Sequence, residues 1–172
     1  MIPGNKQIVH HVVVFEDTTS TVTVPTVDTS CDLSTSKILS VYVPGAMPTI
    51  FPNGGNVKMG MRLSPGASIK LQIHYPKGTI GMQDSTSVNI FFYPASTIGI
   101  REIYADFLLA DWSISIPPDS MKTYYAQYPA TGTTTTDYSL LSVFPHMHLV
   151  GKEIESYAVG PLNDTTKFVR IN

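Results

Sequence analysis

The chain has 172 residues, a length that accommodates one ordinary domain or two small ones. Charged residues make up only 14% of it, while Thr and Ser, with 19 and 16 copies, account for about one residue in five. The net charge is −2 and no stretch is basic, so the chain lacks the positively charged segment expected of a nucleic-acid-binding protein. The apolar runs are too short to span a bilayer. We therefore expect neither nucleic acid nor a membrane as a partner.

Short runs rich in β-branched and aromatic residues recur along the chain, bounded by Gly, Pro, Asn or Ser. The expected strands are residues 6–15, 21–27, 37–43, 69–75, 87–93, 112–116, 139–144 and 153–159. Residues 101–111 fit a helix and a strand equally well, and no other window favours a helix. This pattern predicts an all-β fold of the β-sandwich or jelly-roll type.

Two stretches interrupt the strand pattern. Residues 94–100 are small and follow an apolar strand, so we expect a hinge there that divides the chain into domains 1–97 and 98–172. Residues 129–137 are polar without an apolar anchor, which is typical of an exposed loop. Both ends run directly into strand-like sequence, so we expect a fragment with both domains incomplete and exposed strand edges available for self-association.

The five histidines fall in three places: His10 and His11, His74, and His146 and His148. Alternate residues of a strand share one face, so His146 and His148 can hold one metal ion together. His10 and His11 point to opposite faces of a regular strand, and joint ligation requires a bulge or a local twist. If they form one site, we expect an irregular strand there, with His74 approaching from a neighbouring strand. The alternative is a set of separate histidines that are hydrogen-bonded or exposed to solvent.

Three segments, read together, carry a resemblance to a known family: VHHVVVF (9–15), LQIHYPKG (71–78) and PHMHLVGKEI (145–154). In this order and spacing they resemble the copper type II, ascorbate-dependent monooxygenases, the family of peptidylglycine α-hydroxylating and dopamine β-monooxygenases. The resemblance covers essentially the whole chain, and all five histidines match ligand positions of the family. The chain has a single cysteine, Cys31, and therefore cannot form an internal disulfide, whereas animal members of the family carry several.

The resemblance implies an oxidoreductase with two β-sandwich domains and one copper in each. His10, His11 and His74 would hold the electron-transfer copper, and His146 and His148 the catalytic copper. Such a protein hydroxylates a C–H bond with dioxygen and with ascorbate as electron donor. The family also implies a secreted, periplasmic or cell-surface location, although Met1 begins no signal peptide in this chain.

The chain departs from the family pattern near the second copper site. The family's third ligand there is a downstream methionine, and no methionine follows Met147. Phe144 stands where peptide-amidating members have an arginine for a substrate carboxylate, which favours a neutral or aromatic small-molecule substrate. We therefore expect these 172 residues alone to be inactive.

Two other classes of function remain open. One is a non-catalytic copper-binding β-sandwich that keeps the histidines without turnover. The other is a Thr-rich structural or adhesive module in which the histidines are incidental. Zinc is an alternative metal, because three imidazoles also suit zinc.

Overall fold

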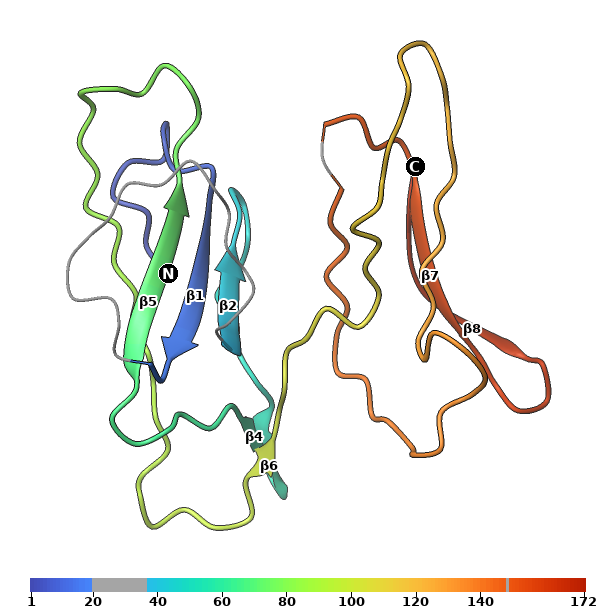
Figure 1. Ribbon diagram of the computed structural model, residues 1–172. Coiled ribbons are helices and arrows are strands. Elements are labelled where there is room, and N and C mark those ends of the chain that lie inside the picture. Colours follow the sequence, from blue (N-terminus) through green and yellow to red (C-terminus); the bar gives the residue numbers. More distant parts are fainter. Residues whose placement is uncertain (20–36, 148) are drawn as a thin grey trace. The chain divides into compact units, whose positions relative to one another are not determined.

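The computed structural model describes residues 1–19, 37–147 and 149–172 (Figure 1). These residues form strands, turns and irregular segments without a helix, which confirms the expected all-β class for the part of the chain described. Accordingly, no described helix has the length and apolarity to cross a membrane. The sheets contain two or three strands each, and sandwich packing stays a prediction.

The chain divides into two compact units, Met1–Leu108 and Leu109–Asn172. We expected the hinge at residues 94–100, but the division between the units comes later in the chain, after Leu108. The reason is that β6 (Arg101–Glu102) pairs in parallel with β4 (Val57–Gly60). This pairing attaches the residues after the expected hinge to the first unit.

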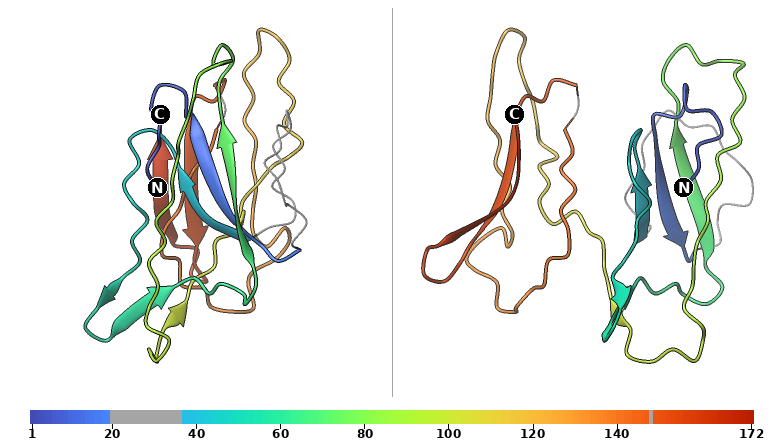
Figure 2. Two further views of the ribbon diagram at one scale, coloured as in Figure 1. Left: turned by 90° about the vertical axis from the view of Figure 1, so that its left-hand side faces the viewer. Right: turned by 180° about the vertical axis from the view of Figure 1, so that it is seen from behind.

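The main sheet of the first unit has β1 (His11–Asp17) at its centre, between β2 (Lys37–Tyr42) and β5 (Ser68–His74). Both pairings are antiparallel, and the strand order is visible from the front and from behind (Figures 1 and 2). Every β1 residue after His11 is buried. A strand covered on both faces requires a continuous apolar run rather than an alternating one, and Val12–Phe15 provides it.

A cluster of buried apolar side chains lies where the chain enters β1. Ile8, Val9 and Val12 form the cluster, and partly buried apolar residues pack against it: Met1, Tyr42, Leu71 and Ile73. Each fully buried aliphatic side chain contributes about 1.5–3 kcal/mol relative to exposure. This cluster fixes the segment directly before His10, and so determines where the first two histidines lie.

The remaining sheets are small. β3 (Asn53–Gly54) pairs with β4 in the first unit, and in the second unit β7 (Ile154–Val159) and β8 (Thr165–Ile171) form an antiparallel hairpin. The ion pair Lys167–Glu155, at 2.9 Å, links the two hairpin strands, and Arg170 of β8 pairs at 3.0 Å with Glu153, which directly precedes β7. Among the described residues of the second unit none is buried, and its exposed apolar side chains include Trp112, Phe144, Leu149 and Leu162.

Three expected strands are wrong: residues 87–93, 112–116 and 139–144 are irregular. A strand needs a continuous backbone partner, and these runs lack one among the described residues. Only Ser87 makes a bridge, to Ile2. At Ser115 the Tyr124 hydroxyl both accepts from the backbone N–H and donates to the carbonyl, so a side chain replaces a strand partner.

Residues 101–111 form no helix and contribute only the two-residue strand β6. The expected strand at 21–27 and the single cysteine, Cys31, lie outside the described residues. In the polar stretch at 129–137, Pro129 is partly buried and the remaining residues are exposed, as expected for a loop.

Candidate metal centre

His11 and His74 are brought together by strand pairing. His11 is the first residue of β1, His74 is the last residue of β5, and the antiparallel register sets them directly opposite each other. Residues opposite each other across an antiparallel pair project to the same face, with Cβ atoms about 4.5–5.5 Å apart. Two imidazoles on one face at this spacing can reach a common point.

His10 joins them because it lies outside the regular strand. Asn5 begins a tight turn in which its carbonyl accepts the N–H groups of Ile8 and Val9, at 3.2 and 3.1 Å. His10 follows this turn, and its own N–H donates to the His74 carbonyl at 3.0 Å. The alternation of faces therefore does not apply to His10 and His11, and the irregular strand start that joint ligation requires is present.

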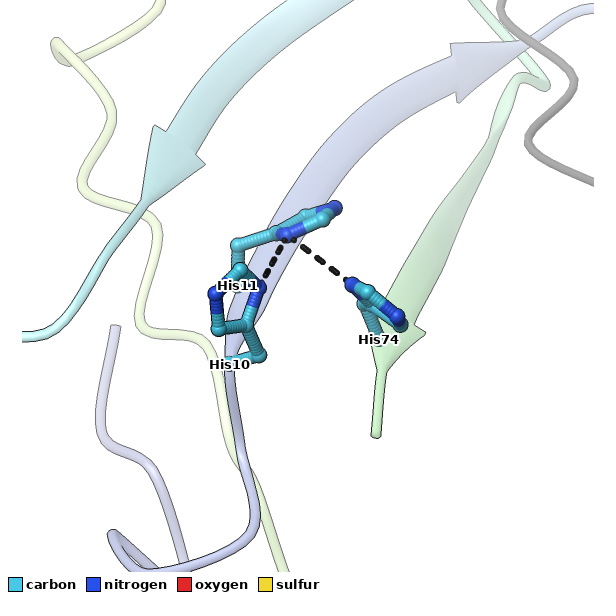
Figure 3. A group of neighbouring side chains, drawn as sticks. All are labelled: His10, His11 and His74. Atoms are coloured by element: carbon cyan, nitrogen blue, oxygen red, sulfur yellow. Dashed lines mark hydrogen bonds between the residues drawn. The ribbon is translucent and has the colours of Figure 1, made fainter. Parts of the chain in front are cut away.

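The three imidazoles form a close group, with one candidate ligand atom from each within 4.8 Å of the others. Figure 3 shows the ring of His10 directly before β1, the ring of His11 at the start of β1 and the ring of His74 at the end of β5, turned toward one another. The Nδ1 atoms of His10 and His11 are 3.1 Å apart, and those of His74 and His11 are 3.3 Å apart. All ring pairs meet edge to face, with centroids 4.7–5.3 Å apart.

The two separations from His11 Nδ1 match those of nitrogens that share one ion. Two nitrogens each about 2.0 Å from a metal, subtending about 90–110°, lie about 2.8–3.3 Å apart. Hydrogen bonding alone accounts for the geometry less well. His11 Nδ1 lies close to two other nitrogens, whereas a ring nitrogen has either one hydrogen or one lone pair to offer.

The group is open to solvent. His10 and His74 are exposed and His11 is partly buried. A metal held there would be accessible to small molecules in solution. The apolar cluster of Ile8, Val9 and Val12 anchors the chain segment next to His10 and His11.

Asp84 supports both segments that carry the histidines, and sequence reasoning missed it. Its Oδ1 accepts the Asn5 N–H at 2.8 Å, and its Oδ2 accepts the Tyr75 hydroxyl at 3.0 Å. Burial opposes ionisation of Asp84, but hydrogen bonds from Thr86, Tyr75 and Asn5 outweigh it and hold its pKa below the ordinary value. Burial, together with the Asp84 carboxylate, raises the pKa of Tyr75. At neutral pH Asp84 is thus a charged acceptor and Tyr75 a donor.

The second predicted pair is described only in part. His146 is exposed, and His148 lies outside the described residues, so the geometry of the pair stays a prediction. Phe144, which precedes them, is 61% exposed.

No model of a known protein family matches the chain, and no solved structure matches it. The resemblance to copper monooxygenases therefore stays a prediction from the three histidine segments. The geometry of His10, His11 and His74 stands independently of it as a candidate metal centre.

Proposed function

We propose that His10, His11 and His74 bind copper, and that the protein acts as a copper-dependent monooxygenase with ascorbate as electron donor. One observation carries the metal site: three imidazoles from two paired strands, with ligand nitrogens within 4.8 Å of one another. The monooxygenase activity is supported by the sequence resemblance, in which these three histidines match the electron-transfer copper.

The donor set fits copper. Imidazole is a ligand for copper, zinc, iron and nickel, and for divalent ions at a given site affinity peaks at copper. Zinc would also fit three imidazoles and is the competing metal. When bound, copper supplies one-electron redox chemistry, and the exposure of His10 and His74 leaves it accessible to a dissolved reductant.

Substrate hydroxylation is proposed for a second copper held by His146 and His148. The overall reaction inserts one oxygen atom of dioxygen into a C–H bond and reduces the other to water, consuming two protons and two electrons from ascorbate. Phe144 in place of an arginine favours a neutral or aromatic small-molecule substrate. The same resemblance supports two β-sandwich domains and a secreted, periplasmic or cell-surface location.

A non-catalytic copper-binding protein is the second candidate. It is favoured by one observation: all three imidazoles of the group lie within the unit Met1–Leu108. Such a protein would bind copper without consuming oxygen.

Titration with Cu(II) against a competing chelator tests the metal site. The unaltered chain should bind one copper tightly, and His74→Ala should weaken that binding, while the matched control His146→Ala should leave it unchanged. Absence of tight binding, or equal binding by His74→Ala, would contradict the site. Ascorbate-dependent oxygen uptake, measured with copper bound at both sites, separates the monooxygenase from the non-catalytic alternative.

A further inference from the structure

A single carboxylate, that of Asp84, connects two distant segments of the first unit. Its Oδ1 accepts the Asn5 N–H at 2.8 Å, and its Oδ2 accepts the Tyr75 hydroxyl at 3.0 Å and the Thr86 N–H at 3.2 Å. Asp84 is partly buried. We call these four residues the Asp84 clip.

Each arm of the clip ends beside a histidine. Asn5 begins the turn that leads to His10, since its carbonyl accepts the N–H groups of Ile8 and Val9. Tyr75 follows His74 directly in the sequence. One carboxylate therefore holds the segment that presents His10 and His11 and, separately, the residue that follows the third imidazole.

The backbone around the clip is packed closely. A Cβ added to Gly4 would lie 2.4 Å from the Ser85 nitrogen, so only glycine fits this contact without a shift. Ile2 and Ser87 exchange two backbone hydrogen bonds of 2.9 Å. The N-terminal segment is thus held against the residues that directly follow Asp84.

We propose that Asp84 is a positioning residue for the three-histidine metal site, setting where His10 and His11 stand relative to His74. This inference rests on the proposed copper site. Metal ligands must be held close to their bonding geometry by the residues around them, and loss of such outer partners weakens metal binding. Asp84 is suited to this role because it fixes both sides of the site with charge-assisted hydrogen bonds.

Two variants of the full chain test the proposal. Asp84→Asn keeps the size of the side chain but removes the charge and one acceptor, and should weaken Cu(II) binding by about tenfold. Tyr75→Phe removes only the hydroxyl that reaches Asp84, so its effect should have the same direction and a smaller size. The matched control is Asp111→Asn, because Asp111 accepts the Ser113 N–H at 2.8 Å in the other unit.

Two readouts separate positioning from general loss of stability. Cu(II) affinity is measured by chelator competition well below the unfolding temperature of each metal-free variant. The Cu(II) hyperfine splitting in the electron paramagnetic resonance (EPR) spectrum reports the ligand geometry directly. We expect altered splitting in Asp84→Asn and Tyr75→Phe and an unchanged spectrum in Asp111→Asn.

The outcomes distinguish this inference from the proposed function. If the unaltered chain binds no copper, the metal site fails and the positioning role fails with it. If the unaltered chain binds copper and both clip variants match it in affinity and spectrum, the site stands and the positioning role of Asp84 is overturned. Should Asp84→Asn not fold, Tyr75→Phe alone decides between these results.

Discussion

Replacing Glu16 by glutamine tests how the far end of β1 is held. Glu16 is only 3% exposed, its carboxylate accepts the Ser64 N–H, and Lys37 Nζ lies 3.7 Å away. The hydrogen bond from the Ser64 backbone, aided by the Lys37 charge, holds the pKa of Glu16 below its ordinary value despite burial. The charged form is therefore the one that stabilises the fold.

The size of the effect follows from these contacts. A hydrogen bond to a charged group contributes about 1.5–3 kcal/mol. The ion pair with partly exposed Lys37 adds at most about 1 kcal/mol. Glutamine keeps the shape and one accepting oxygen but loses the charge, so we expect Glu16→Gln to lower local stability by about 2 kcal/mol at pH 7.

The effect should depend on pH with a defined sign. Because the pKa of Glu16 is lowered in the folded state, its stabilisation is complete above the ordinary glutamate value of about 4.3 and is lost as pH falls through the lowered value. The difference between the unaltered chain and Glu16→Gln should therefore shrink in acid and vanish once Glu16 is protonated.

Hydrogen exchange of the β1 amides measures this local stability without assuming that both units unfold together. Glu155→Gln is the control, because Glu155 pairs with Lys167 in the other unit and should leave β1 protection unchanged. Equal β1 protection in Glu16→Gln and the unaltered chain at pH 7 would refute the reasoning. So would a difference that persists unchanged at strongly acidic pH.

Three further predictions follow from the same structure. Among the described residues of the second unit none is buried, and Trp112 and Phe144 are exposed, so light scattering after size exclusion should show self-association; a monomer resistant to dilution would contradict this. Copper titration of these 172 residues should give one tight site and one weak site, and ascorbate-coupled hydroxylation should be absent. The reason is that no methionine follows Met147 to serve as the soft third ligand of the second copper. Two equally tight sites with turnover would overturn this. Phe144 cannot pair with a carboxylate, so glycine-extended peptides should not be hydroxylated, and hydroxyglycine product would refute this.

Sequence reasoning located four of the paired strands, but the expected strands did not include β4 or β8, which are also paired. The runs at 37–43, 69–75 and 153–159 correspond to β2, β5 and β7, because a paired strand and a β-rich run share the same side-chain preferences. The run at 6–15 overlaps β1, but the strand begins only at His11, since the Asn5 turn occupies the residues before it. Side-chain preference carries no information on the partner, which is why the runs at 112–116 and 139–144 misled.

The histidines of the candidate site could be predicted from the sequence, but the residue that holds their segments in place, Asp84, could not. The resemblance to the copper monooxygenases grouped His10, His11 and His74, whereas their spacing alone favoured separate histidines. The irregular strand start that joint ligation requires could be stated in advance, and the structure brings the three imidazoles together. Asp84 gave no comparable signal, because its role depends on tertiary contacts with Asn5 and Tyr75 that lie 79 and 9 residues away. The second pair, His146 and His148, stays a prediction.

The central claim is that three imidazoles share one copper ion. Pulsed EPR of the chain loaded with one equivalent of Cu(II) counts the imidazole nitrogens bound to it. We predict three coordinated imidazoles in the unaltered chain and two in His74→Ala, with the His146→Ala spectrum unchanged. A count that His74→Ala does not reduce, or Cu(II) bound without imidazole, would contradict the account.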